Sequence, residues 1–282
     1  MCKKIAFVGA GSMAEAMISG ITGRGEWKPG QISVTNRENI ERLNFLRDVY
    51  HVQTTLSYED LFRDTGIVVI AVKPKDLFAA MHAIKQYLRK DMLLLSVAAG
   101  VSIASIEKIA GQELAVIRSM PNTSAAIGKS ATAISCNSHV TESQLETAVS
   151  LLETIGSVTL VEEKHLDAVT GLSGSGPAYI YYMIEAMEQS AAEIGLDHSA
   201  AKQLIIQTLA GAADMLKQSP KTPGTLRREI TSPGGTTEAG LKILQDKAFQ
   251  ETMIECIVEA TRQSKRLGDK LSEEIDKKSI SV

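Results

Sequence analysis

The sequence predicts an α/β domain followed by an all-α domain, and three observations support this division. The first half alternates short strands with helical patterns, and strands such as Ile67–Val72 are continuously apolar, as in a parallel sheet covered on both faces. A glycine-rich turn joins the first strand to the first helix. From Lys164 onward the apolar period is helical and stays so. We therefore expect one domain over residues 1–163 and a second over residues 164–282.

The length and charge of the chain agree with two ordinary domains. At 282 residues the chain is long enough for two domains that each bury a core. It carries 30 Lys plus Arg against 33 Asp plus Glu, and this balance argues against nucleic acid or an anionic membrane as a partner. No apolar run approaches the roughly 20 residues of a membrane span, so we expect no membrane partner.

The cysteines and histidines predict neither a disulfide framework nor a metal site. Cys2, Cys136 and Cys256 are odd in number and far apart, a pattern that favours the cytoplasm. The five histidines have no metal-ligand or triad spacing. No pair of catalytic carboxylates stands out either. We therefore expect the chemistry to come mainly from a bound cofactor, with one or two hydroxyls from the protein.

A glycine-rich turn follows the first strand, Lys3 to Gly9, and opens a helix. The turn has the pattern G-x-G-x-x-A in the strand-turn-helix context that the pattern requires. Gly9 permits the tight turn, Gly11 lets a pyrophosphate approach the backbone, and Ala14 lets the helix pack closely on the strand. The N–H groups at the start of the helix favour the phosphate charge. The predicted dinucleotide contacts in this turn are Gly9, Ala10, Gly11, Ser12, Met13 and Ala14.

The end of the second strand favours NADPH over NADH. A site for NAD normally has Asp or Glu here, on the ribose 2′-hydroxyl, whereas this chain has Asn36 and Arg37 after Gln31–Thr35. Amide donors and a guanidinium suit a 2′-phosphate. We predict NADPH as the cofactor and NADH as a weaker alternative. The other interpretation is that Arg37 belongs only to the solvated first turn of the next helix.

Three more loops are predicted at the carboxyl ends of parallel strands, where ligands bind in such sheets. Lys73, in the first of them, is either a cofactor contact or an exposed loop lysine. Arg118, in the third, is either a substrate anchor or a structural residue. The predicted cofactor contacts from the first two loops are Ala71, Val72, Lys73, Pro74 and Ala98.

The helices of the second half are apolar on too many sides for surface helices. One follows the small-residue turn Leu172–Ala178 and runs to Gly195, and the next runs from Ser199 to Lys217. A domain of about 120 residues has few places to bury them. We therefore infer a homodimer, or a larger homo-oligomer, that shares these helices.

The stretch Thr231–Leu241 is a candidate anion site. Pro233 favours a turn, the two glycines after it let a ligand approach the backbone, and the threonines and Glu238 that follow suit an N-cap and a first helical turn. The N–H groups of that turn would face a carboxylate or a phosphate. From these residues alone, a plain helix cap after a Pro-Gly turn is the alternative.

Together these residues resemble the pyrroline-5-carboxylate reductases, the enzymes of the last step of proline biosynthesis, over essentially the whole chain, and bacterial members most of all. The specific match is Ile230–Leu241, ITSPGGTTEAGL. Ser124 departs from the family, which often has proline there; this loosens a pocket loop and removes no reacting group. Supporting matches are Phe7–Glu15, Ala71–Pro74, Arg118–Thr123 and Asp167–Ala178.

The resemblance implies a Rossmann-type NAD(P)-binding N-terminal domain and an all-α C-terminal dimerisation domain that interlocks with a second subunit. It also implies the reaction, in which hydride from NAD(P)H reduces the C=N bond of 1-pyrroline-5-carboxylate to give L-proline. Ser232, Gly235 and Thr236 would hold the substrate carboxylate, with Gly234 in the same substrate-binding turn. Thr237 would be the catalytic residue and would hydrogen-bond the ring nitrogen.

Two alternatives stay open at this point. A non-catalytic NADP-binding regulator on the same scaffold is expected to have an eroded Thr231–Leu241 stretch, which is intact here. An enzyme like the 3-hydroxy acid dehydrogenases is expected to carry a catalytic lysine on the helical domain, and no comparable motif stands out.

Overall fold

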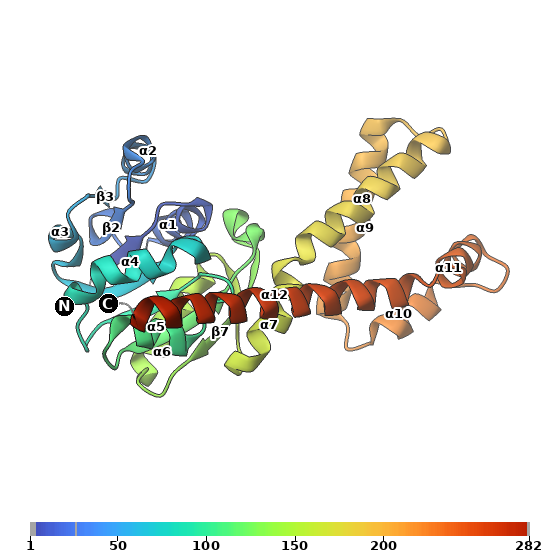
Figure 1. Ribbon diagram of the computed structural model, residues 1–282. Helices are drawn as coiled ribbons and strands as arrows, with labels where there is room; N and C mark the ends of the chain where they lie inside the picture. Colours follow the sequence, from blue (N-terminus) through green and yellow to red (C-terminus); the bar gives the residue numbers. More distant parts are fainter. Residues whose placement is uncertain (1–3, 26, 281–282) are drawn as a thin grey trace. The chain divides into compact units, whose positions relative to one another are not determined.

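The computed structural model describes residues 4–25 and 27–280 (Figure 1). Cys2 and Lys3 lie outside the described residues. Contacts within the chain define two compact units, which we call the sheet unit (residues 1–175 and 259–282) and the helical unit (residues 176–258). The domain boundary after residue 163 stays a prediction of the sequence.

The sheet unit holds one eight-stranded sheet with the order β3-β2-β1-β4-β5-β6-β7-β8. Neighbouring strands are parallel except for β6 and β7. The strand order reverses direction between β1 and β4, and a ligand crevice is expected beyond the carboxyl ends of these two strands. The strands are β1 (Lys4–Val8), β2 (Ile32–Thr35), β3 (Gln53–Thr54), β4 (Thr65–Ile70), β5 (Leu93–Ser96), β6 (Ala115–Met120), β7 (Ser130–Cys136) and β8 (Gly156–Leu160).

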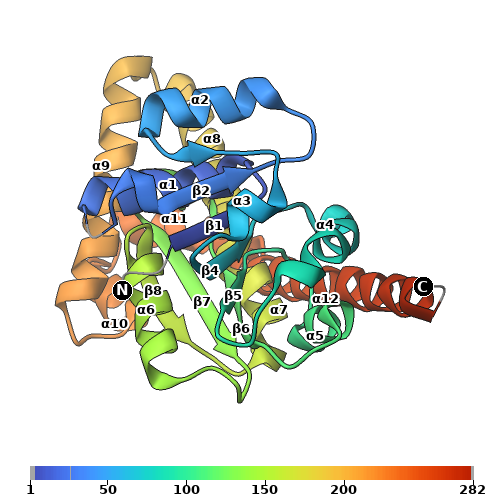
Figure 2. The same ribbon diagram turned by 90° about the vertical axis from the view of Figure 1, so that its left-hand side faces the viewer.

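Helices cover both faces of the sheet because the central strands are apolar on both sides. In β1, Ile5 and Phe7 belong to the core beneath α1, whereas Ala6 and Val8 belong to the core beneath α4 and α5. Figure 2 shows α4, α5 and the end of α12 on one side of the sheet. This arrangement confirms the predicted Rossmann-type α/β fold. The helices of this unit are α1 (Ser12–Arg24), α2 (Ile40–Tyr50), α3 (Tyr58–Phe62), α4 (Leu77–Ile84), α5 (Ile103–Ala110), α6 (Glu142–Glu153) and α7 (Leu166–Val169).

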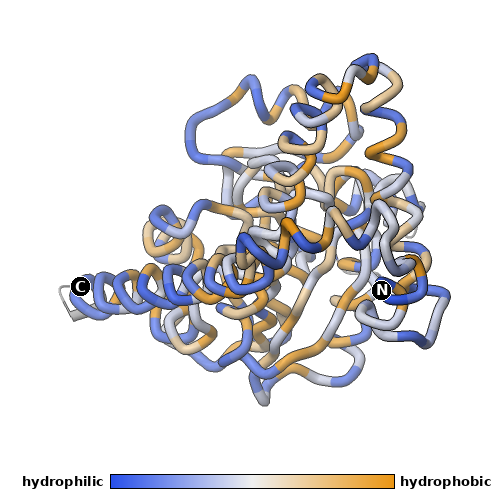
Figure 3. Tube along the Cα trace, turned by 90° about the vertical axis from the view of Figure 1, so that its right-hand side faces the viewer, coloured by the Kyte–Doolittle hydropathy of each residue, from blue (hydrophilic) through white to orange (hydrophobic). Residues whose placement is uncertain are grey.

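The last helix, α12 (Phe249–Ile280), packs on the sheet unit over its final turns. Ile275 is buried in the core beneath α4 and α5, and Lys108 of α5 pairs with Asp276 at 2.6 Å. Figure 3 shows that this end of the helix is mostly hydrophilic. The end of α12 is therefore held on the sheet unit by a small number of apolar and ionic contacts such as these. Residues 259–280 thus belong with the sheet, whereas the helical pattern of the sequence places them in the second domain.

The helical unit buries almost nothing within the chain. Among its residues only Ala191, Ala201 and Ile205 are buried, while Tyr182 and Leu204 are 79% and 59% exposed. Broad apolar helix faces of this unit therefore remain uncovered within the chain. Besides the start of α12, the unit contains α8 (Gly176–Glu193), α9 (His198–Gln218), α10 (Pro223–Glu229) and α11 (Thr236–Asp246).

Candidate active site

The glycine-rich turn lies between the end of β1 and the start of α1. Gly9 has a φ of +109°, which L side chains rarely adopt, and its N–H donates to the Thr35 carbonyl at 2.9 Å. A Cβ on Gly9 would lie 2.5 Å from the Ala71 carbonyl oxygen, closer than real Cβ contacts. The close approach of this turn to the end of β4 therefore requires glycine.

A cleft of about 570 Å³ opens beside this turn, beyond the carboxyl ends of β1, β2 and β4. This is the crevice that the strand order predicts, and its volume is within the usual range for cofactor sites. The predicted cofactor residues that line it are Gly9, Ala10, Gly11, Asn36, Arg37, Ala71, Val72 and Lys73.

The other predicted cofactor residues lie beside the cleft. Ser12 is the first residue of α1, and Ala14 is fully buried, as close packing of α1 on the sheet requires. Met13 packs against the core on the α1 side, and Ala98 is buried in the core on the α4 side. Pro74 begins the short helix after β4. Direct contact of these residues with a cofactor stays a prediction.

Several cleft residues carry no motif that singles them out in the sequence. Tyr58, at the start of α3, lines the cleft together with Ala79, Ala80 and Ala83 of α4. An aromatic ring beside small side chains suits a planar base. In the sequence, the signal that could have indicated an open helix face here is the set of small alanine side chains at positions i, i+1 and i+4 of a helical pattern. Lys75 adds a cation to the same lining.

Asn36 and Arg37, the two polar residues at the end of β2, differ in how firmly their side chains are held by hydrogen bonds. The Asn36 Oδ1 accepts the N–H groups of Glu38 and Asn39 at 2.9 and 2.8 Å, so this side chain holds its own loop together. Arg37 has an 85% exposed side chain, and its Nε lies 3.1 Å from the Glu38 carboxylate. Because exposed pairs of this kind are weak, Arg37 remains available to an anion.

In the helical unit, the stretch Thr231–Leu241 forms a turn followed by α11. Gly235 is the N-cap, so the predicted threonine cap is wrong, and the two threonines and Glu238 occupy the first helical turn. Gly234 has a φ of +71°, and its N–H donates to the Glu238 carboxylate at 2.7 Å. The Gly235 N–H donates to the Ser232 carbonyl at 3.0 Å. The φ of Gly234 therefore favours glycine, and a Cβ on Gly235 would lie 3.0 Å from the Ser232 carbonyl oxygen, a tight contact.

The start of α11 offers donors to a small anion. Ala239 is the first residue whose N–H closes the helix, onto Gly235 at 3.2 Å, so the N–H groups before it have no intrahelical acceptor. A hollow of about 690 Å³ beside the turn includes Gly234 and Gly235. Ser232, Thr236 and Thr237 lie on the turn outside the lining of this hollow. Its charged lining residues are Arg227, Arg228, Lys242, Glu238 and Asp246.

Arg118 is a structural residue. Its side chain on β6 is only 9% exposed, pairs with Glu163 at 3.2 Å and lies 3.9 Å from Asp167. Glu163 also accepts the Ile103 N–H at 2.8 Å, and Asp167 accepts the Ser264 hydroxyl of α12 at 2.7 Å. Through these two carboxylates the guanidinium links β6 to the start of α5, to α7 and to α12, which favours the structural one of the two interpretations.

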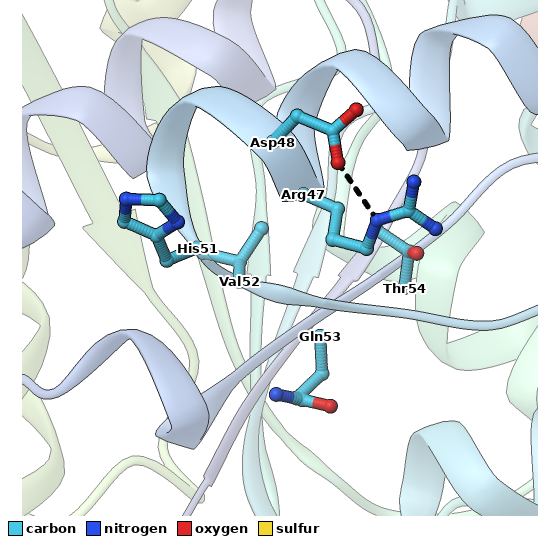
Figure 4. Close-up of a pocket in the computed structure, with 6 residues that line it drawn as sticks. All are labelled: Arg47, Asp48, His51, Val52, Gln53 and Thr54. Atoms are coloured by element: carbon cyan, nitrogen blue, oxygen red, sulfur yellow. Dashed lines mark hydrogen bonds and ion pairs between the residues drawn. The ribbon is translucent and has the colours of Figure 1, made fainter.

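A further surface hollow, of about 540 Å³, lies at the end of α2 and along β3. Figure 4 shows the Arg47 and Asp48 side chains turned toward one another, 2.9 Å apart, with the His51 ring away from this pair. No glycine turn and no helix N-terminus contributes to its lining, so we assign it no part in the site.

Within residues 4–25 and 27–280, no three His, Cys, Asp or Glu side chains gather as metal ligands do. The same residues form no helix with the length and apolarity that crossing a membrane requires.

Two family models match the chain, one in each half. Residues 4–100 match the family described as NADP oxidoreductase, coenzyme F420-dependent, and residues 163–267 match pyrroline-5-carboxylate reductase dimerisation. The first match covers the strands and the glycine turn that line the cleft. The second covers the helical unit, including the Thr231–Leu241 turn.

Curated relatives and solved structures are similar to the chain over nearly its full length. Pyrroline-5-carboxylate reductase 2 of Bacillus subtilis (strain 168) is 53% identical over 96% of this chain and 97% of its own. The Arabidopsis thaliana enzyme is 37% identical over 94% and 95%. A Coxiella burnetii pyrroline-5-carboxylate reductase structure has a TM-score of 0.88 at 34% identity, covering 95% of this chain and 99% of that one.

A second solved structure holds a nucleotide. The Plasmodium falciparum pyrroline carboxylate reductase with NADP bound has a TM-score of 0.85 at 29% identity, and the match covers 95% of this chain and 98% of that one. The sheet order, the cleft at the glycine turn and the intact Ile230–Leu241 turn agree with these similarities, and the chain belongs to the pyrroline-5-carboxylate reductase family.

Proposed function

We propose that this chain reduces the C=N bond of 1-pyrroline-5-carboxylate to give L-proline, with NADPH as the hydride donor. The observation that carries the proposal is the intact Ile230–Leu241 turn in a chain that also has a dinucleotide cleft. The two sites together supply what the reaction needs, a place for a nucleotide and a place for a small carboxylate.

The sheet unit would hold the cofactor, which supplies the hydride when it is bound. The backbone of Gly9 to Gly11 and the start of α1 suit the pyrophosphate, since free N–H groups at a helix N-terminus favour anions. Arg37 and Lys73 add positive charge to the lining. Tyr58 and the α4 alanines suit the adenine ring.

The helical unit would hold the substrate. The free N–H groups at the start of α11, with Ser232 and Thr236, suit the carboxylate. Thr237, which is partly buried in the same turn, would hydrogen-bond the ring nitrogen. Because the imine nitrogen can take its proton before hydride arrives, a strong protein acid is not required. Thr237 would orient the imine and stabilise the amine as it forms.

The test is NADPH oxidation, followed at 340 nm, by the purified protein with 1-pyrroline-5-carboxylate. We expect turnover that depends on both compounds and yields proline. Protein that binds NADPH but turns over no substrate would contradict the proposal and favour the non-catalytic regulator.

Cofactor preference gives a separate prediction. Replacing Arg37 by alanine should lower kcat/KM for NADPH by about 10- to 100-fold, the usual effect of losing a hydrogen-bonded charge, and leave NADH turnover nearly unchanged. Arg47→Ala is the matched control, because Arg47 is also exposed and pairs with the carboxylate next to it in the sequence. Equal losses with both nucleotides in Arg37→Ala would refute a 2′-phosphate contact.

We further propose that the chain forms a homodimer through the helical unit. The exposed apolar side chains of α8 and α9 support this, since monomers rarely expose such patches. Light scattering should give at least twice the 30.3 kDa chain mass. Leu204→Glu in α9 should lower that mass, whereas Leu56→Glu, at a similarly exposed site of the sheet unit, should not. A monomeric wild type, or an undisturbed Leu204→Glu assembly, would contradict this interface.

We place the enzyme in the cytoplasm. Cys136 and Cys256 are both free thiols, and a reducing compartment keeps such thiols unpaired.

A further inference from the structure

One arginine of α2 reaches back to the glycine-rich turn. The Arg42 Nε donates to the Ala10 carbonyl at 2.8 Å, across 32 residues of sequence. The same guanidinium is hydrogen-bonded and ion-paired with the Glu15 carboxylate, and it lies over the Phe45 ring at 5.1 Å. The side chains of Arg42 and Glu15 are 25% and 27% exposed, so water screens this pair only in part.

The bond to Ala10 fixes the direction of a neighbouring donor. The Ala10 carbonyl and the Gly11 N–H belong to one planar trans peptide, in which they point in opposite directions. With the carbonyl held toward Arg42, the Gly11 N–H points away from α2. Gly11 lines the dinucleotide cleft, and within the described residues its N–H has no acceptor. The guanidinium therefore fixes the direction of the Gly11 N–H, although Arg42 itself does not line the cleft.

The ion pair between Arg42 and Glu15 changes the charge beside the cleft. Glu15 lies in the first turn of α1, the helix whose N-terminus faces the cleft. An uncompensated carboxylate there would repel a phosphate, since both are negative. Arg42 neutralises one side of this carboxylate, and the Tyr50 hydroxyl donates to its other oxygen at 3.0 Å. Burial, and then the hydrogen bond to Glu15, raise the pKa of Tyr50. A phenol with its ordinary pKa of about 10 already keeps its proton at neutral pH, so the hydroxyl is a donor there.

We propose that Arg42 is a positioning residue for the dinucleotide: it orients the Ala10–Gly11 peptide toward the pyrophosphate and cancels the charge of Glu15 beside it. The proposal rests on the NADPH-dependent function proposed above. It concerns a residue that lies outside the cleft lining and carries no part of the glycine motif.

The test compares Arg42→Gln, Glu15→Gln, the double variant and Arg42→Lys with the wild type. Arg63→Gln is the matched control, because Arg63 forms an exposed ion pair with Asp60 at 2.8 Å in the same unit. The Kd for NADPH, kcat with saturating NADPH, thermal unfolding, and hydrogen exchange of residues 9–15 in the protein without nucleotide are measured for each.

In Arg42→Gln we expect the Kd for NADPH to rise about tenfold, with kcat within about twofold and faster exchange in residues 9–15. Glu15→Gln should stay within about threefold of the wild type, because the Ala10 contact remains. The double variant should bind about threefold better than Arg42→Gln, since the repelling charge is gone. The Kd of Arg42→Lys for NADPH should lie between those of the wild type and Arg42→Gln, because an ammonium restores the charge but not the planar fork.

A Kd within twofold of the wild type in Arg42→Gln, or an equal rise in Arg63→Gln, would overturn the proposal. If Arg42→Gln did not fold, Arg42→Lys would decide: wild-type binding together with wild-type exchange in residues 9–15 would overturn the orienting role. A wild type that bound no NADPH would instead refute the proposed function. In that case, an unchanged rate of hydrogen exchange in residues 9–15 of Arg42→Gln would still refute the proposal that Arg42 orients the glycine-rich turn.

Discussion

Replacing Gly9 by alanine is expected to raise the Kd for NADPH by at least about 100-fold, because the change costs about 3 kcal/mol or more in the bound turn. Two effects add. The residue has a φ of +109°, which strains any L side chain, and the new Cβ would lie 2.5 Å from the Ala71 oxygen and 2.7 Å from the Ala71 carbonyl carbon. Both obstacles are backbone, so neither can rotate away. The turn must shift, and the donors that it presents to the pyrophosphate shift with it.

Gly23→Ala is the control for this change. Gly23 lies in the same segment, inside α1, and a Cβ there meets nothing within 4 Å. The control should bind NADPH like the wild type and unfold at an equal or higher temperature, since alanine favours a helix over glycine by about 1 kcal/mol. Binding by Gly9→Ala within tenfold of the wild type, measured by titration of nucleotide fluorescence, would show that the turn tolerates the Cβ and does not hold the pyrophosphate.

Thr237→Ala is expected to lower kcat by about 10- to 200-fold, the rate equivalent of losing 1.5 to 3 kcal/mol from one hydrogen bond to a charged group. The hydroxyl lies in the first turn of α11, where the neighbouring N–H groups are unpaired. Removing it leaves the backbone donors in place, so the KM for the substrate should change less than kcat. Thr237→Ser keeps the hydroxyl and should recover most of the rate.

Thr252→Ala is the matched control, because Thr252 occupies the first turn of the next helix, α12, and its hydroxyl donates only to the Ala248 carbonyl, at 2.9 Å. Its kcat should stay within about twofold of the wild type, since an exposed helical hydroxyl contributes little. If Thr237→Ala retained full kcat in steady-state assays, Thr237 would be at most a substrate contact, and its assignment as the catalytic residue would fail.

Local patterns determined the cofactor half of the site. The glycine spacing, the apolar strand before it and the helical pattern after it lie within a few residues of one another, so the backbone turn follows from sequence-local sterics. Gly9, Gly11 and Lys73 line the cleft, and their contact with a cofactor stays a prediction. The helix start at Thr236 is equally local, although the cap proved to be Gly235. Which residue is the N-cap depends on the backbone angles of that one residue, and a run of hydroxyl-bearing residues does not determine those angles.

The apolar excess of the second half predicted an uncovered surface, and the exposed side chains of α8 and α9 agree with it. The same helical pattern gave no sign that α12 belongs to two units. Periodicity reports that a segment is helical and which side is apolar, but it does not report which surface that side meets.

Contacts between distant residues were decided only by the tertiary structure. Arg118 became structural because Glu163, Asp167 and Ser264 converge on it from elements far along the chain. Arg42 meets the Ala10 carbonyl only because α2 packs beside α1, a juxtaposition that no spacing in the sequence encodes. By itself the sequence determined the turns, the strands and the family, since these follow from neighbouring residues. The partners of each charged side chain required the packing of whole elements, because a charge on a helix has many possible partners until the core fixes its direction.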